Sequence, residues 1–464
     1  MFFNSATFFP SMKDKKIDVI GLGVSNTELV FRLVESGAVV TVRDRRNEDQ
    51  IRSSTVERIK ERGVTLKLGK NYLENLDGEI IFRTPGMHFN TKELVEARER
   101  GKIVTSELEL FMELCPCKTI GITGSDGKTT TSTLIAEMLK KSGRKVHLGG
   151  NIGKPLLPIL DKVGPDDICV VELSSFQLIS MRCSPDIAVI TNISPNHLDV
   201  HKDLDEYINA KLNIIRHQDA FSKTVLSFDN KKTYEFAPMV RGRLSLFSRK
   251  EEVKFGAWMD KNGDIYHSTD GRAVKLFNRK DVLLPGLHNI ENLCAAISAV
   301  WSLASPYAIA EVAKTFTGVP HRIEFIKSVD GVKYYNDSIA TTPTRTVAGI
   351  NSFDEKLIVL LGGYDKLIPF TNLGAPICDK AKEIILMGPT APKIEAVVKE
   401  APNYDPAKLK ITHADNLPDA VNKARSSAKK GDIVILSPAC ASFDSYQNFE
   451  ERGEHFRELV NNLK

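Results

Sequence analysis

Residues 123–130, Thr-Gly-Ser-Asp-Gly-Lys-Thr-Thr, have the residue types of a phosphate-binding loop. The segment lies between a predicted strand and a predicted helix, so its backbone N–H groups and the helix N-terminus would face an anion. Lys128 could reach the terminal phosphates, and the hydroxyl of Thr129 could hold Mg²⁺. Ile122 stands where the standard loop has its first glycine, so this is a variant loop. The pattern predicts ATP or GTP as ligand, with a chance glycine-rich turn as the alternative.

Acidic and imidazole side chains follow later strands of the same region. Glu172 ends a predicted strand, where a carboxylate beside a nucleotide can hold a metal ion, although a solvated strand-end carboxylate would look the same. His197 and His201 follow another strand in the pattern His-x-Asp-x-His. That spacing could suit a metal, or these could be hydrogen-bonding loop residues. We expect a metal ligand at His197 and not at His201.

A second glycine-rich turn, Gly-Leu-Gly-Val-Ser-Asn at residues 21–26, precedes Asp44 by about 20 residues, which imitates a dinucleotide-binding fingerprint. Asn26 replaces the third glycine of that fingerprint, so the match is incomplete. Arg45 and Arg46 favour a phosphorylated ligand over a neutral one. The alternative is that the glycines only allow a tight turn between strand and helix.

Short apolar runs alternate with helical patterns through three blocks of the chain, which is typical of parallel sheets covered by helices. We therefore predict an α/β protein of three domains. Residues 1–106 would form a Rossmann-like domain, residues 107–318 a P-loop-type ATPase domain with a parallel sheet, and residues 319–464 a second Rossmann-like domain.

Composition excludes several classes of protein. The 464 residues carry 63 Lys and Arg against 59 Asp and Glu, a balance too weak to indicate a nucleic-acid partner. No apolar run approaches the roughly 20 residues of a membrane span. Seven cysteines without a CxxC pair or a zinc spacing indicate a reduced, cytoplasmic chain.

The order of motifs resembles the Mur ligases, ATP-dependent amide-forming enzymes of peptidoglycan precursor synthesis. Four segments carry the resemblance: 123–130, 172–178, His288-Asn289 with Asn292, and His321-Arg322. The resemblance implies that ATP is bound by Gly124, Ser125, Asp126, Gly127, Lys128, Thr129, Thr130, Asn289, Asn292, Arg322 and Asp337.

Three further segments, residues 21–25, 436–444 and 448–453, resemble the members that add D-glutamate to UDP-N-acetylmuramoyl-L-alanine. The first domain would then bind the UDP-sugar through Val24, Ser25, Asp44, Arg45, Arg46, Thr84 and Asn151. The third would bind D-glutamate through Thr341, Lys366, Ser442 and Phe449.

The resemblance also implies two Mg²⁺ ions, held by Thr129, Glu172, His197 and a carbamate that Lys211 forms with CO₂. Lys128, His197 and Lys211 would be the catalytic residues. By its own pattern, Lys211 would be a solvated helix residue.

One departure concerns the amino-acid site: Ile339 stands where the family has lysine, and Thr342 where it has asparagine. A related ligase for another amino acid is therefore an alternative. So are a non-catalytic, nucleotide-regulated binding protein and an NAD-dependent dehydrogenase built on the first block. We expect small-molecule substrates only, and a monomer.

Overall fold

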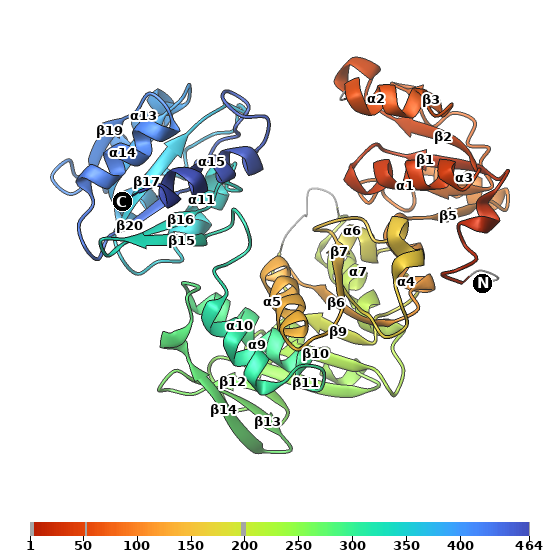
Figure 1. Cartoon of the computed structure of the whole chain (residues 1–464), viewed down its shortest axis with the longest axis horizontal. Helices are drawn as coiled ribbons and strands as arrows, with labels where there is room; N and C mark the ends of the chain where they lie inside the picture. Colours follow the sequence, from red (N-terminus) through yellow and green to blue (C-terminus); the bar gives the residue numbers. More distant parts are fainter. Residues whose placement is uncertain (1–3, 52, 196–200, 464) are drawn as a thin grey trace. The chain divides into compact units, whose positions relative to one another are not determined.

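The computed structural model describes residues 4–51, 53–195 and 201–463. Its strands form three sheets of five, nine and six strands, one for each predicted block (Figure 1). The predicted α/β class is confirmed. His197 lies outside the described residues, and so does the side chain of Val24.

The first sheet is wholly parallel, in the order β3-β2-β1-β4-β5. Its strands are β1 (Lys16–Ile20), β2 (Val39–Asp44), β3 (Thr65–Leu68), β4 (Ile80–Phe82) and β5 (Ile103–Thr105). The connecting helices are α1 (Val24–Glu35), α2 (Ser53–Lys60) and α3 (Lys92–Glu99).

The second sheet has the order β14-β13-β12-β11-β10-β9-β6-β8-β7 and is parallel from β7 as far as β12. Its strands are β6 (Lys118–Thr123), β7 (Val146–Gly150), β8 (Ile168–Glu172), β9 (Ile187–Ile190), β10 (Lys223–Ser227), β11 (Arg243–Ser248), β12 (Gly256–Met259), β13 (Asp264–Thr269) and β14 (Arg272–Asn278). The helices of this part are α4 (Glu107–Leu114), α5 (Lys128–Lys141), α6 (Ser175–Leu178), α7 (Leu204–Arg216), α8 (Lys231–Tyr234), α9 (Leu287–Val300) and α10 (Pro306–Thr315).

At one edge of the second sheet, β13 and β14 form an antiparallel hairpin that pairs antiparallel with β12. Asp270 (φ +52°) and Gly271 (φ +76°) join the two strands of this hairpin. A two-residue Asp-Gly connection with both φ angles positive is a favoured hairpin turn. The predicted parallel sheet is thus present from β7 to β12, and this hairpin, for which no strands were predicted, extends it at one edge.

The third sheet has the order β15-β16-β20-β17-β18-β19 and is parallel except for the antiparallel pair β15–β16. Its strands are β15 (Glu324–Val329), β16 (Val332–Asn336), β17 (Leu357–Gly362), β18 (Ala381–Met387), β19 (Lys410–His413) and β20 (Ile433–Leu436). Its helices are α11 (Pro343–Ile350), α12 (Gly374–Lys380), α13 (Ala391–Lys399), α14 (Leu417–Ser427) and α15 (Phe449–Asn461).

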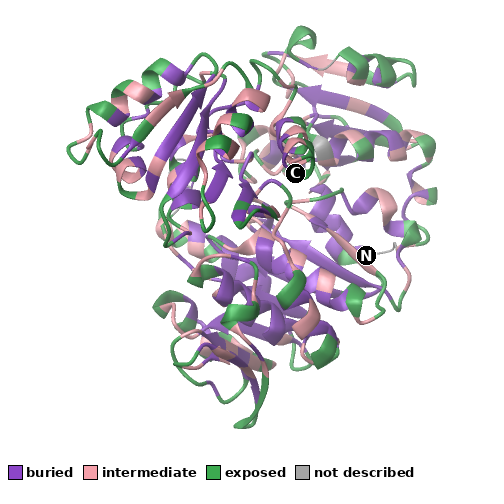
Figure 2. Cartoon of the chain, turned by 60° about the vertical axis from the view of Figure 1, so that its left-hand side comes forward, coloured by how far each residue is buried: buried purple, intermediate pink, exposed green. Residues whose placement is uncertain are grey.

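The central strands are buried along their length (Figure 2). In β17, Leu357, Val359 and Leu361 pack into one apolar cluster, whereas Ile358 and Leu360 pack into another. Successive strand residues point to opposite faces, so a strand covered by helices on both sides must be apolar throughout. This is why the continuous apolar runs predicted these strands correctly.

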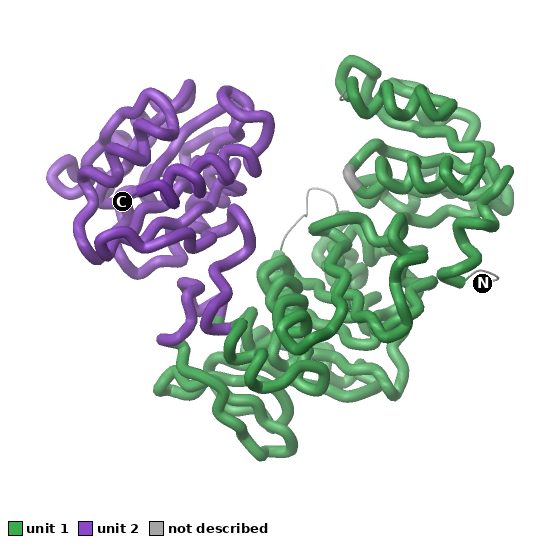
Figure 3. The backbone as a smooth tube through the Cα atoms, in the orientation of Figure 1, with its two compact units in different colours: residues 1–279, 290–312 green, residues 280–289, 313–464 purple. Residues whose placement is uncertain are grey.

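The chain divides into two compact units, residues 1–279 with 290–312 and residues 280–289 with 313–464 (Figure 3). The first unit contains the first and second sheets, and the second unit contains the third. Within the described residues no helix is long and apolar enough to span a bilayer. The predicted domain boundaries at residues 106 and 318 stay predictions.

Candidate active site

The turn from β6 to α5, residues 124–127, has the strand–turn–helix arrangement that a phosphate loop needs. Gly124 (φ +147°) and Gly127 (φ +80°) adopt backbone conformations that favour glycine. A Cβ atom on Gly127 would lie 2.1 Å from Oδ1 of Asn292, and one on Gly124 would lie 1.9 Å from Oγ1 of Thr191. The turn is therefore packed too closely against α9 and the end of β9 to carry side chains at these two positions.

Lys128, the first residue of α5, folds back over this turn. Its Nζ donates hydrogen bonds to the carbonyl oxygens of Gly124 (3.0 Å) and Ser125 (2.8 Å). Gly127, at the N-cap of α5, has no side chain that could cap the helix. A cation and a helix N-terminus thus meet at one turn, which is the electrostatic requirement for binding phosphate.

Neighbouring polar groups fix the shape of the turn. Asp126 donates its N–H to Oδ1 of Asn192 (3.0 Å), and its carbonyl accepts a hydrogen bond from Oγ1 of Thr191 (2.6 Å). The hydroxyls of Ser125 and Tyr207 are 2.9 Å apart. Sequence reasoning did not assign these roles to Thr191, Asn192 or Tyr207, because they depend on contacts between distant segments.

Lys211, in α7, is buried beside the same turn rather than solvated. Its Nζ donates to the carbonyl of Gly124 (2.8 Å) and lies 3.3 Å from Oγ1 of Thr123. It also lies 4.7 Å from the centre of the Tyr207 ring. Burial, and then the nearby charge of Lys128, lower the pKa of Lys211 to about 7. Near neutral pH, a substantial fraction of the Lys211 side chain is therefore the neutral, nucleophilic amine.

Glu172 ends β8 and is 1% exposed. Its Oε1 accepts a hydrogen bond from Nδ2 of Asn151 (2.9 Å), whereas its buried Oε2 has no partner among the described residues. A buried carboxylate oxygen without a partner is costly, so the position fits a cation ligand. Asn151 is thus held at this carboxylate, and its predicted contact with the UDP-substrate stays a prediction.

His201 is buried beside α6 and α7. One ring nitrogen lies 2.9 Å from Oγ of Ser175, and the other lies 3.3 Å from Oε2 of Glu206. The imidazole also stacks on Phe176, with ring centres 5.1 Å apart. These contacts agree with the expectation that His201 is a hydrogen-bonding residue.

In the first sheet, the turn after β1 and the end of β2 come together. A Cβ atom on Gly21 (φ +87°) would lie 2.9 Å from Cβ of Thr84, so the turn and Thr84 are neighbours. Asp44 accepts hydrogen bonds from the N–H of Leu22 (2.8 Å) and from Nη2 of Arg46 (2.8 Å). Arg45 is exposed, and Ser25 lies in the first turn of α1.

The charge of Asp44 follows from these contacts. Burial by itself would raise the pKa of Asp44, but the hydrogen bonds from Arg46 and Leu22 outweigh it and leave the pKa below its usual range. Arg46 is therefore partly neutralised by Asp44, whereas Arg45 extends into solvent. Both arginines are predicted to bind the UDP-substrate. The charge of Arg45 is more available to a phosphate than that of Arg46, because Arg46 already pairs with Asp44.

Two asparagines of the predicted ATP site lie one turn apart in α9. Asn292 approaches the glycine turn, with its Oδ1 3.4 Å from Oγ1 of Thr131. Asn289 donates through Nδ2 to the carbonyl of Pro285 (2.7 Å).

Asp337 follows β16 in the third sheet and is buried. Its Oδ2 accepts a hydrogen bond from Oγ of Ser437 (2.8 Å), and its Oδ1 accepts one from the N–H of Ile323 (3.3 Å). Burial raises the pKa of Asp337 to about 7, against the opposing effects of these bonds and of the nearby Arg322 charge. The predicted pair Arg322 and Asp337 is therefore close enough to interact.

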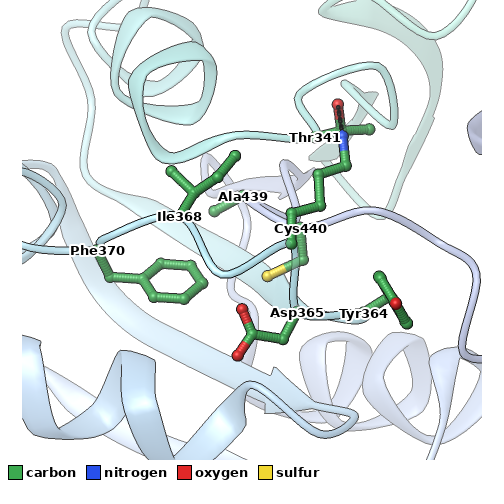
Figure 4. Close-up of a pocket in the computed structure, with 8 residues that line it drawn as sticks. Thr341, Tyr364, Asp365, Ile368, Phe370, Ala439 and Cys440 are labelled. Atoms are coloured by element: carbon green, nitrogen blue, oxygen red, sulfur yellow. Dashed lines mark hydrogen bonds between the residues drawn. The ribbon is translucent and has the colours of Figure 1, made fainter. Parts of the chain in front are cut away.

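Lys366 and Thr341, two residues of the predicted D-glutamate site, meet with 3.3 Å between Nζ and Oγ1. Both line a cavity of about 10 Å³ (Figure 4), enough for about one water molecule. Its lining consists of Thr341, Tyr364, Asp365, Lys366, Ile368, Phe370, Ala439 and Cys440. Ser442 and Phe449 are not among these described lining residues, so the predicted set is only partly assembled here.

Arg452, whose position in α15 sequence reasoning had left without a role, joins the segments around this cavity. Its buried guanidinium donates to Oγ and the carbonyl of Ser338 (3.0 and 2.9 Å) and to the carbonyls of Cys440 and Ala441 (3.2 and 3.1 Å). Ala441 in turn accepts the N–H of Tyr364 (3.0 Å). The buried cation therefore fixes the position of the segments from which Lys366 and Ser442 project.

Comparison with known proteins identifies the family. Residues 122–300 match the Mur ligase middle domain, and residues 321–440 match the Mur ligase glutamate ligase domain. A protein of Acetivibrio thermocellus named UDP-N-acetylmuramoylalanine--D-glutamate ligase is 48% identical over 461 residues, covering 98% of each chain. The chain belongs to the Mur ligase family. A protein of the same name in Clostridium acetobutylicum is 46% identical to this Mur ligase, again over 98% of each chain.

Solved structures share the fold of this Mur ligase at low sequence identity. The UDP-N-acetylmuramate-alanine ligase of Thermotoga maritima has a TM-score of 0.58 at 18% identity, covering 97% of this chain and 100% of its own. A pseudomurein peptide ligase of Methanothermus fervidus has a TM-score of 0.54 at 20% identity, with the same coverage. These two structures show the shared fold, whereas the predicted family is confirmed by the domain matches and the two relatives above.

Proposed function

We propose that this Mur ligase uses ATP to join D-glutamate to UDP-N-acetylmuramoyl-L-alanine, a step of peptidoglycan precursor synthesis. The names of the two relatives, which match over nearly the whole chain, support this substrate pair. The structural observation that carries the proposal is the glycine turn 124–127, with the ammonium groups of Lys128 and Lys211 both bonded to it.

The reaction needs activation, because a carboxylate and a protonated amine do not condense in water. In the proposed route, the alanyl carboxylate attacks the γ-phosphorus of ATP, which gives an acyl phosphate and ADP. The free amine of D-glutamate then attacks the carbonyl carbon, and phosphate leaves. Catalysis of such a transfer is mainly positioning and stabilisation of charge. Lys128 would neutralise oxygens of the transferred phosphoryl group.

Two Mg²⁺ ions would be held by Thr129, Glu172, His197 and a carbamate on Lys211. The unpartnered, buried Oε2 of Glu172 supports a cation at this position. When bound, the ions would neutralise charge on the phosphate oxygens. At Lys211, burial favours the neutral amine, which can attack CO₂ and release a proton. The product is an anion that replaces the lysine cation.

The first and third sheets would each carry the binding residues for one of the other two substrates. Val24, Ser25, Asp44, Arg45, Arg46, Thr84 and Asn151 would bind the UDP-substrate, and Thr341, Lys366, Ser442 and Phe449 would bind D-glutamate. The ammonium of Lys366 contacts Thr341 at the small cavity. We infer that this ammonium turns toward a carboxylate of D-glutamate when the amino acid binds, and that the turn opens the cavity. The domain boundaries, the monomeric state and a cytoplasmic location stay predictions.

The decisive experiment is release of ADP and phosphate by the purified chain with Mg²⁺ and ATP. We expect product only when both UDP-N-acetylmuramoyl-L-alanine and D-glutamate are present. A panel of amino acids with this one UDP-substrate tests the amino-acid preference, on which the apolar Ile339 bears directly. Amide formation with another amino acid but not with D-glutamate would replace the proposal by a related ligase activity.

Two controls separate the other classes of protein. Protection against heat by ATP and Mg²⁺ is expected, and protection by NADH instead would favour a dehydrogenase. Nucleotide binding without amide formation from any amino acid would favour a nucleotide-regulated binding protein.

A further inference from the structure

Three cysteines converge at the end of β6 that lies away from the glycine turn. Cys115 directly follows α4, Cys117 directly precedes β6, and Cys169 lies in β8. The Sγ atoms of Cys115 and Cys117 are 3.7 Å apart, and those of Cys117 and Cys169 are 3.5 Å apart. Among the described residues, this is the only group of three or more His, Cys, Asp or Glu side chains with the spacing of metal ligands.

The backbone holds these sulfur atoms in place. Helix α4 ends at Leu114, and Cys115 is extended (φ −58°, ψ +122°), as a residue before proline tends to be. Pro116 then restricts the short link to Cys117. β6 and β8 are parallel neighbours, with Thr119 opposite Cys169. One thiol therefore projects from strand β8, and the other two come from the three-residue link that joins the end of α4 to the start of β6.

The distances between the sulfur atoms suit a metal ion. Zinc–sulfur bonds of about 2.3 Å in tetrahedral geometry place two sulfur ligands about 3.8 Å apart. The measured separations of 3.7 and 3.5 Å are close to this value, and all three sulfur atoms lie within 4.8 Å of one another. All three cysteines are free thiols.

Burial and charge describe the surroundings of the three thiols. Cys117 and Cys169 are buried, whereas Cys115 is half-buried and gives access from solvent. The nearby carboxylate of Asp186 accepts hydrogen bonds from Thr119, and that of Asp167 pairs with Lys145 and His147. The thiols themselves would therefore supply the negative charge for an ion. Thiolate ligands select soft ions such as Zn²⁺ and Cu⁺ over Mg²⁺.

We propose that Cys115, Cys117 and Cys169 form a binding site for one thiophilic d¹⁰ metal ion, Zn²⁺ or Cu⁺. Each thiol loses its proton to solvent on binding. Water completes the shell of Zn²⁺, whereas Cu⁺ needs only the three sulfur ligands. The ion ties α4 to β6 and β8. The six residues of β6 separate this site from the glycine turn by about 20 Å, so it is distinct from the ATP site.

The test uses the full chain, fully reduced, without substrates and with excess Mg²⁺ to occupy oxygen-ligand sites. Titration with Co²⁺ is expected to give a sulfur-to-cobalt charge-transfer absorption that saturates at one ion per chain. Zn²⁺ should bleach this absorption. An anaerobic Cu⁺ titration against a competing chelator decides whether Cu⁺ is the preferred ion. Absence of any charge-transfer absorption, together with no retention of Cu⁺, would overturn the proposal.

Two substitutions make the test specific. We expect Zn²⁺ to raise the Tm of the unmodified chain. Cys115→Ser, at the half-buried position, should abolish this rise and weaken Co²⁺ binding by at least about 100-fold. Cys378→Ser, at a half-buried cysteine of the other compact unit, should leave both unchanged. Equal binding by Cys115→Ser would refute the site. A disulfide among these cysteines in protein purified without reductant would assign the cluster to redox pairing instead.

Discussion

Replacing Lys128 by alanine removes the cation that lies directly on the glycine turn. The Lys128 ammonium now bonds to the carbonyl oxygens of Gly124 and Ser125 at 3.0 and 2.8 Å. A phosphate bound at the N-terminus of α5 would compete for this ammonium and gain a charge-assisted hydrogen bond. In the alanine variant the helix N-terminus remains, so nucleotide should still bind, but the phosphoryl group loses a preorganised positive charge.

The size of the effect follows from the role of that charge. Removing one preorganised donor to charge that develops in a transition state costs about 2.7–4 kcal/mol. At about 1.4 kcal/mol per factor of ten, kcat should fall by roughly 100- to 1,000-fold. Because the interaction strengthens as charge moves onto the transferred group, we expect kcat to change more than KM for ATP.

The assay is release of ADP at saturating UDP-substrate and D-glutamate, with KM for ATP measured in parallel. Lys140→Ala is the matched control, because Lys140 lies near the other end of α5 and pairs only at the surface with Glu137 (2.8 Å). This control should stay within about twofold of the unmodified enzyme. If Lys128→Ala kept kcat within about threefold, the assignment of the turn as a phosphate loop would be wrong.

Three other perturbations test other parts of the reasoning. Lys211→Ala should lose activity that short carboxylic acids partly restore, since they can replace a carbamate; loss without rescue, and without CO₂ dependence of the unmodified enzyme, would argue against the carbamate. The double change Arg45→Ala and Arg46→Ala should raise KM for the UDP-substrate by about tenfold and leave KM for ATP unchanged, as expected for loss of a charge-assisted bond. An unchanged KM for the UDP-substrate would mean that neither arginine binds it. Burial raises the pKa of Glu107 from 4.5 to about 7, so the folded protein retains this proton longer than the unfolded chain and loses stability as pH rises between these values. The free energy of unfolding of Glu107→Gln should therefore rise relative to that of the unmodified chain by up to about 3 kcal/mol as the pH increases from 5 to 8. Thermal unfolding at several pH values measures this difference, and a difference that does not change with pH would contradict the prediction.

Much of the fold could be predicted because its signals are local. The buried parallel strands β8 and β17 are short apolar runs, and α5, α7 and α15 each begin after a Gly, Asp or Asn at the N-cap. The hairpin of β13 and β14 was missed although Asp270-Gly271 is a favoured two-residue turn between extended segments. No strands were predicted between residue 191 and the third block, so this turn signal was not used.

The site was harder to predict, because its decisive contacts join distant segments. Lys211 is separated from Thr123 by 88 positions in the sequence, and only the packing of α7 buries its amine beside the turn. The cysteines had no recognisable zinc spacing, since Cys117 and Cys169 come together only through the pairing of β6 with β8. Arg452 likewise finds its acceptors on the segments at 338 and 440–441.

The arrangement around Gly124 gives these contacts a common physical meaning. Its carbonyl oxygen accepts hydrogen bonds from the ammonium groups of both Lys128 and Lys211, which places two cations against one neutral acceptor. Burial is the main cause of the lowered pKa of Lys211, and repulsion from the neighbouring ammonium of Lys128 lowers it further. The repulsion is relieved if an anion binds at the turn, or if Lys211 itself becomes an anion by reacting with CO₂. A site that concentrates positive charge before its ligand arrives is suited to phosphate, because binding then removes an unfavourable interaction as well as forming new bonds.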